Sequence, residues 1–65
     1  MTSGKGIAKR RKQKEWTQSQ LAKKAGLSRG YVAAIEQGRR RPSLKTLVII
    51  AKALEVDVRG LKEDI

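Results

Sequence analysis

The residues of this sequence that could do chemistry are almost all cations. Lys and Arg number 16 against six Asp and Glu, which gives a net charge of +10. A small body with this much positive charge repels itself unless a polyanion binds to it. We therefore predict a surface that binds the phosphates of nucleic acid, with an anionic membrane surface as the second alternative.

Two basic runs concentrate this charge, and they are expected to play different roles. Lys9, Arg10, Arg11 and Lys12 form the first run. We expect it to be a solvated helix face, with direct phosphate contact by one or two of its residues as the alternative. The second run, Arg39, Arg40 and Arg41, follows Gly38.

Catalytic chemistry has few candidates in this chain. The sequence has no His and no Cys, which removes imidazole acid–base chemistry, disulfides and thiolate metal sites. The tripeptide Gly4-Lys5-Gly6 lacks the spacing of a phosphate-binding loop. Glu63 and Asp64 are adjacent in the tail and are not a positioned acid–base pair. We predict that the protein is not an enzyme and that it has no catalytic residue, no metal site and no cofactor.

No segment of the sequence has the pattern of a membrane or export signal. The longest apolar run, residues 47–51, is far shorter than the roughly 20 residues of a spanning helix. The basic residues near the N-terminus are not followed by an apolar stretch. We expect one domain over residues 1–65, in a cytoplasmic, nucleoid-associated protein with no membrane partner and no small-molecule effector.

The elements that must position the charges are helices with clear start and stop signals. A first helix is predicted over about residues 4–14. Thr17 and Gln20 form a capping box before a second helix over residues 18–25, and Gly26 can end that helix in the left-handed conformation. Ser28 can cap a third helix that ends near Gly38. Because so few residues separate the second and third helices, they must turn sharply, as in a helix-turn-helix.

The second half of the chain is also predicted to be helical. Ser43 can cap a fourth helix, and a short fifth helix is expected around residues 58–61. The core positions of the fourth helix follow a helical spacing: Leu44, Leu47, Ile50, Ala51 and Leu54. The predicted fold class is therefore all-α.

The segment QSQLAKKAGLSRGYVAAIEQ, residues 18–37, is similar to the helix-turn-helix of the phage repressor/Cro family, also called the XRE family. Similar residues continue from about Ile7 to Leu61, including the segments IEQG, PSLKTL and AKAL. The resemblance implies a compact five-helix lambda-repressor-like domain, with the helix-turn-helix in the second and third helices. It also implies a sequence-specific regulator of transcription, a repressor rather than an activator. Such a protein binds an inverted repeat in double-stranded DNA as a homodimer, with the third helix in the major groove.

The expected base-reading residues lie on the third helix, on the face opposite Val32 and Ile35 and at its start. They are Ser28, Arg29, Gly30, Ala33 and Ala34. Arg29 is the one expected to bind guanine, whereas the two alanines can only touch thymine methyl groups. We therefore expect Arg29 and DNA shape to supply much of the specificity.

A second set of residues is expected at the phosphates or in the minor groove: Thr17, Gln18, Tyr31, Gln37, Arg39, Arg40 and Arg41. Gln18 begins a helix, and helix N-termini attract anions; a solvated side chain is the alternative. Tyr31 is expected to pack with its hydroxyl reaching a phosphate, or simply to pack. The three arginines follow the third helix directly, so contact with phosphates or a narrow minor groove is favoured over a solvated loop.

The resemblance also implies an ion pair between Arg11 and Glu36, which joins the first and third helices; two exposed side chains are the alternative. Glu15 and Glu55 stand where the family commonly has glycine, so positive φ angles are expected there. Trp16 is expected in the core rather than as a base-stacking platform.

An apolar patch for the homodimer is expected from Ile49, Val58, Leu61 and Ile65.

The alternative function is an antitoxin that binds a toxin protein and represses its own operon. The chain has almost no length outside the five predicted helices for a toxin-binding segment, which favours the regulator.

Overall fold

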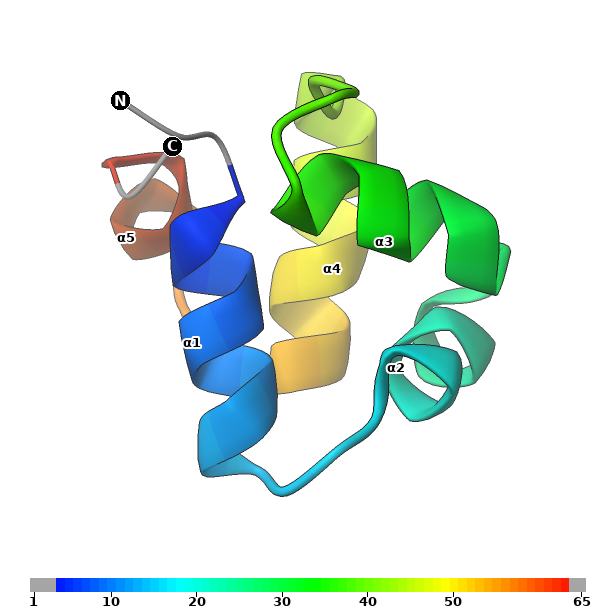
Figure 1. The fold of residues 1–65 in the computed structure, drawn as a ribbon. Helices are drawn as coiled ribbons and strands as arrows, with labels where there is room; N and C mark the ends of the chain where they lie inside the picture. Colours follow the sequence, from blue (N-terminus) through cyan, green and yellow to red (C-terminus); the bar gives the residue numbers. More distant parts are fainter. Residues whose placement is uncertain (1–3, 64–65) are drawn as a thin grey trace.

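The computed structural model describes residues 4–63, with side chains as far as Leu61. The regular secondary structure of this part of the chain consists of helices joined by short loops. The helices are α1 (Lys5–Gln13), α2 (Gln18–Ala25), α3 (Arg29–Glu36), α4 (Leu44–Leu54) and α5 (Val58–Glu63). In Figure 1, α4 lies behind α1 and α3, and it contacts α1, α2 and α5. The prediction of an all-α fold with five helices is confirmed. Within the described residues, no helix is long and apolar enough to span a bilayer.

Three helices begin at the cap residues that the sequence predicts. The Thr17 hydroxyl accepts from the backbone N–H of Gln20 at 3.1 Å, and the Thr17 N–H donates to the Gln20 side chain at 2.7 Å. Ser28 and Ser43 accept in the same way, each at 3.1 Å, from the third residue of the helix that follows. Each such cap satisfies an N–H that the helix leaves unpaired and is worth about 1 kcal/mol.

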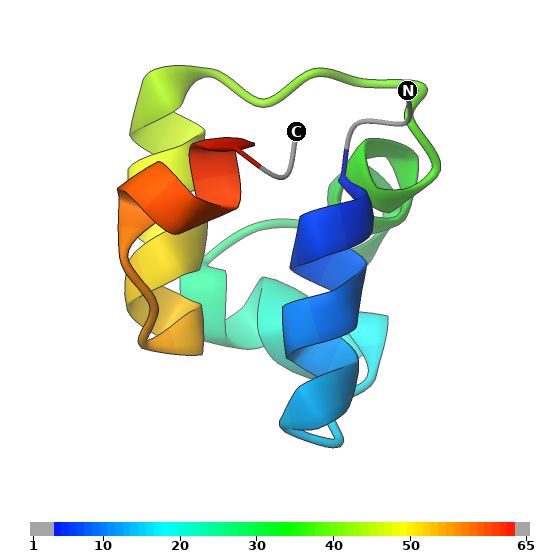
Figure 2. The same ribbon diagram turned by 90° about the vertical axis from the view of Figure 1, so that its left-hand side faces the viewer.

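The hydrophobic core takes residues from all five helices. The fully buried side chains are Ile7, Leu21, Val32, Ile35, Ile50, Leu54 and Leu61. Each removes apolar surface from water, which contributes about 1.5–3 kcal/mol per side chain. Figure 2 shows α5 lying against α4, with α1 on the other side of the fold.

Two apolar side chains lie elsewhere than the sequence predicts. Leu61 is fully buried in the core, so its assignment to a dimer patch is wrong. The reason is that α5 folds back against α4 and directs this side chain inward. Leu44 was expected in the core but is 60% exposed. It is the first residue of α4, and the buried face of that helix begins one turn later, at Leu47.

Trp16 packs against the core from the loop between α1 and α2. The ammonium groups of Lys14 and Lys24 stand over its ring, 5.3 Å and 4.9 Å from the centroid. These cation–π contacts cover the ring, in agreement with a packing role rather than base stacking.

Lys14 also donates to Glu55 at 2.9 Å, and this contact holds the pKa of the Glu55 carboxyl below its usual value.

Asp57 lies directly before α5 and holds the first turn of that helix. Its carboxylate accepts from the backbone N–H of Arg59 at 2.8 Å. This hydrogen bond, together with the nearby Arg59 guanidinium, lowers the pKa of Asp57. The sequence signal was present, because Asp is among the favoured residues before a helix.

Glu15 and Glu55 both have a φ of 60°, so the expected left-handed conformations are present. Replacing Glu15 with glycine is expected to raise the free energy of unfolding by about 1 kcal/mol, because a Cβ costs roughly 1–2 kcal/mol in this conformation. For a domain of this size the gain corresponds to about 4–8 °C in thermal melting. Glu15→Ala removes the same charge but keeps the Cβ. An equal gain from alanine would show that the charge, not the backbone, is responsible.

Candidate nucleic-acid interface

The α2–α3 unit is a tight helix-turn-helix. Gly26 ends α2 with a φ of 69°, and the N–H of Leu27 donates to the carbonyl of Ala22 at 2.8 Å. Ala22 is 3% exposed, so its small side chain is enclosed where the two helices pack. Ser28 then caps α3 immediately. The turn therefore fixes where the N-terminal end of α3 emerges from the protein.

Ser28, Arg29 and Gly30 are all exposed at this end of α3, and we call these three residues the recognition patch. No atom lies within 4 Å of the position that a Cβ on Gly30 would occupy. The backbone at Gly30 can therefore approach another surface closely. Arg29 supplies the one charged side chain of the recognition patch.

Ala33 and Ala34 do not belong to this exposed surface. They are only 8% and 9% exposed, so the prediction that they face outward is wrong. The chain after α3 folds back over its C-terminal half, and the N–H groups of Arg39 and Arg40 both donate to the Ala34 carbonyl, at 2.9 Å and 3.2 Å. A methyl side chain is too short to extend past such neighbours. The exposed surface at the N-terminal end of α3 is therefore mainly the recognition patch.

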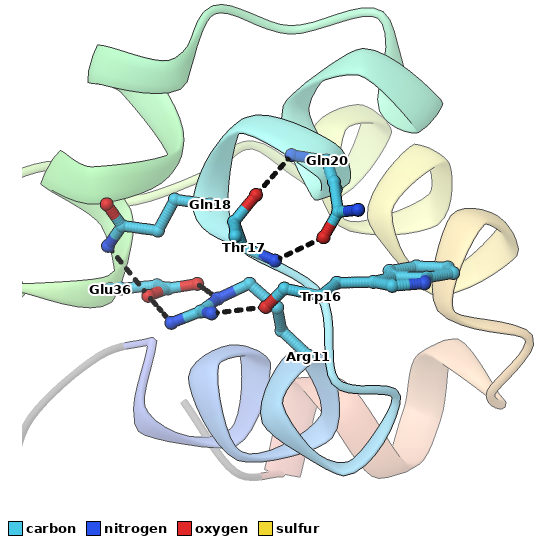
Figure 3. A network of polar contacts seen from close by, with 6 residues as sticks. All are labelled: Arg11, Trp16, Thr17, Gln18, Gln20 and Glu36. Carbon is cyan, nitrogen blue, oxygen red and sulfur yellow. Dashed lines mark hydrogen bonds and ion pairs between the residues drawn. The ribbon is translucent and has the colours of Figure 1, made fainter.

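Arg11 and Glu36 form the ion pair that the family resemblance implies. Arg11 donates from Nε to Oε2 of Glu36 at 2.7 Å and from Nη2 to Oε1 at 3.0 Å. A third bond runs from Nη1 to the carbonyl of Trp16 at 2.7 Å (Figure 3). The two side chains are 11% and 6% exposed, so the alternative of two exposed side chains is wrong. The pair therefore links α1 to α3 and, through the Trp16 carbonyl, to the loop before α2.

Gln18 is attached to the same ion pair. Its Nε2 donates to Oε1 of Glu36 at 3.0 Å (Figure 3). A carboxylate only accepts hydrogen bonds, so the amide must present its NH₂ group to Glu36. The second N–H of that group remains available at the N-terminus of α2, where anions are favoured. Thr17 is exposed next to it, with its oxygen engaged in the cap.

The loop after α3 gathers the remaining predicted phosphate contacts. Arg39, Arg40 and Arg41 are all exposed. Arg39 donates to the side chain of Gln37 at 2.9 Å, and the Arg40 guanidinium lies 5.3 Å from the centroid of the Tyr31 ring. Tyr31 is half-buried and packs against the core. The loop and the end of α3 therefore form one basic surface.

This surface is nearly free of negative charge. Neither α2 nor α3 has an acidic residue in its first turn. The acid at the end of α3, Glu36, is paired with Arg11. Within the described residues, no group of three or more acidic side chains could hold a metal ion. The arrangement is suited to binding phosphates.

The helix-turn-helix family model matches residues 7–61. This chain belongs to the XRE-type helix-turn-helix family. Among similar proteins, the immunity repressor protein of Bacillus phage phi105 is 49% identical over 61 residues, covering 94% of this chain and 42% of that protein. The ImmF control region 10 kDa protein of the same phage is 45% identical, covering 86% of this chain and 62% of that protein. The chain thus spans less than two thirds of either phage protein.

Solved structures agree with this assignment. The XRE-type domain superposes on the restriction-modification controller protein C.AhdI from Aeromonas hydrophila with a TM-score of 0.87 and 36% identity, over 89% of this chain and 88% of that one. SinR, a Bacillus subtilis regulator of biofilm formation solved in complex with DNA, gives a TM-score of 0.86 and 35% identity over 91% and 95% of the two chains. The family is thus one of DNA-binding transcription regulators.

Proposed function

We propose that this XRE-type domain is a sequence-specific regulator that binds double-stranded DNA with α3 in the major groove. The observation that carries the proposal is the recognition patch, exposed and free of acids, together with a Gln18 amide whose orientation is set by Glu36. A helix-turn-helix presents this end of its second helix to base edges. The antitoxin alternative has no comparable observation in its favour.

Arg29 is the base-reading side chain in this proposal. A guanidinium can donate two parallel hydrogen bonds to O6 and N7 of guanine, which distinguishes guanine by about 1–3 kcal/mol. Gly30 adds no side-chain contact of its own, but its bare backbone lets α3 enter the major groove deeply. The Ser28 hydroxyl can donate or accept a hydrogen bond at the edge of a base. With so few reading side chains, sequence-dependent DNA shape supplies the rest of the specificity.

Two further groups of residues are proposed to contact phosphates. One group is Gln18 and Thr17 at the N-terminus of α2, and the other is Arg39, Arg40 and Arg41 with Gln37 and Tyr31. Contacts of this kind fix the position of the protein on the duplex without reading sequence. The fixed position is what allows one arginine to select a base.

The proposed assembly on DNA is a symmetric homodimer acting as a repressor. The name of the phage immunity repressor supports the sign of regulation. Two copies related by a two-fold axis would bind an inverted repeat with half-site centres about 34–36 Å apart. Of the expected dimer residues, Ile49 and Val58 are half-buried and retain some accessible apolar surface, whereas Ile65 lies outside the described residues.

Selection of bound duplexes from a random DNA library at about 150 mM salt tests this proposal, since nonspecific charge binding is weakened there. Enrichment of an inverted repeat with half-site centres about 10 bp apart is expected. Binding at low salt without any enriched sequence would contradict the proposal. That result would direct the search to a protein partner, as the antitoxin alternative requires.

A further inference from the structure

The exposed face of α1 carries a line of lysines that the proposed interface does not use. Lys5, Lys9 and Lys12 follow the spacing i, i+4 and i+7, which places them on one side of a helix. All three are exposed, and we call them the lysine stripe. They line a shallow groove of about 610 Å³ together with Ala8, Gln13 and Glu36.

The basic run of α1 divides into inward and outward residues. Arg11 is held by Glu36. Arg10 is half-buried, with its Nη2 atom 3.7 Å from where a Cβ on Gly60 would stand. Lys9 and Lys12 point to the groove instead. The expectation that the whole run is a solvated face therefore fails for the two arginines.

The lysine stripe does not serve the stability of the fold. Lys5 occupies the first residue of α1, where the helix dipole disfavours a positive charge. Its neighbours along the stripe are like charges at helical contact spacing, and such pairs destabilise a helix. Among the described residues, none of the three lysines has an ion-pair partner. A ligand that is itself negative would offset this repulsion.

The groove is continuous with the proposed phosphate contact at α2. Its wall includes Glu36, the residue that binds the Gln18 amide. The charge of Glu36 is already matched by Arg11, so it does not repel an anion strongly. Gly4 packs so closely against the backbone of Ile35 that a side chain there would overlap its carbonyl. The N-terminus of α1, and the lysine stripe with it, is therefore fixed beside the end of α3.

We propose that the lysine stripe binds the phosphate backbone of the duplex beyond the half-site, so that the operator is longer than the bases read by α3. This inference rests on the proposed function. The stripe extends about 10 Å along the helix at 1.5 Å per residue, and one DNA strand carries a phosphate every 3.4 Å of axis. Three lysines can therefore follow about three consecutive phosphates.

The test compares two duplexes and two lysine-to-glutamine variants of the full chain. One duplex holds only the selected inverted repeat, and the other extends it by about one helical turn, 10 bp, on each side. The variant is K5Q/K9Q/K12Q. Its control, K23Q/K45Q/K52Q, removes the same three charges from exposed positions on α2 and α4. Binding is measured against salt concentration, and thermal melting is recorded for each protein.

The wild type and the control are expected to bind the longer duplex more tightly and with a steeper salt dependence. K5Q/K9Q/K12Q is expected to lose that advantage, with the salt slope on the longer duplex reduced by about 1 per lysine in each protomer, while binding to the short duplex is retained. Its melting temperature should be unchanged or higher, because like-charge repulsion is removed.

An advantage of the longer duplex that persists in K5Q/K9Q/K12Q would overturn the inference. So would an equal loss on both duplexes, or a wild type that gains nothing from the flanks. A wild type that does not prefer the selected repeat over a scrambled one would instead refute the proposed function. The two failures are therefore distinguishable.

Discussion

Replacing Glu36 with alanine is expected to lower the free energy of unfolding by about 3–5 kcal/mol, the cost of leaving one partner of a buried ion pair uncompensated. Arg11 would keep its bond to the carbonyl of Trp16 but lose both bonds to the carboxylate. Its side chain is only 11% exposed, so water cannot easily replace the lost partner. Gln18 would lose its acceptor as well. Urea unfolding followed by the fluorescence of Trp16 measures the change.

Two further variants distinguish the cost of an unpaired buried charge from the cost of losing the ion pair as a whole. Arg11→Met/Glu36→Leu replaces both charges with apolar side chains and should be less destabilising than Glu36→Ala alone, because no unpaired charge is left in the interior. Glu36→Gln keeps an acceptor for Gln18 but not the charge, and an intermediate loss is expected. An unchanged melting temperature for Glu36→Ala would contradict a structural role for the pair.

Replacing Arg29 with alanine is expected to reduce binding to the selected operator by about 1–3 kcal/mol for each half-site. A dimer on an inverted repeat uses the side chain twice, so the combined loss reaches about 2–6 kcal/mol if the two sites are independent. Because Ala33 and Ala34 are buried and Gly30 has no side chain, α3 offers no second cation to replace the guanidinium of Arg29. Titration of wild type and variant on the operator gives the loss.

The control for this prediction is Arg41→Ala, which removes an exposed arginine from the loop. A lost phosphate contact should weaken all sequences alike and reduce the salt slope by about 1. Arg29→Ala should instead flatten the preference for guanine at one position of each half-site. Equal weakening on the operator and on a scrambled duplex would assign Arg29 to the phosphates and not to the bases.

The helix starts and stops could be predicted from the sequence because their causes are local. A cap at Thr17, Ser28 or Ser43 depends on residues within one turn of the helix, and these residues are adjacent in the chain. The left-handed backbone at Glu15 was anticipated differently, from the glycine that the family has there. The ion pair of Arg11 likewise came from the resemblance, since residues 25 positions apart leave no local signal.

The burial or exposure of Ala34, Leu61 and Leu44 could not be predicted from the sequence, because it depends on which distant segments of the chain cover each side chain. Ala34 is covered because the chain returns across the end of α3, and Leu61 because α5 turns back onto the core. Leu44 has the spacing of a core residue but lies beyond the elements that cover the rest of α4. The groove at the lysine stripe also needed the structure, because Glu36 enters it from another helix.

Methylation protection on the selected operator shows whether the N-terminal end of α3 binds in the major groove. Dimethyl sulfate methylates guanine at N7, which lies in the major groove, whereas adenine N3 lies in the minor groove. We expect protection of a guanine N7 at symmetric positions in both half-sites, lost at those positions in Arg29→Ala. Protection confined to adenine N3, or guanines as reactive as in free DNA, would contradict the account.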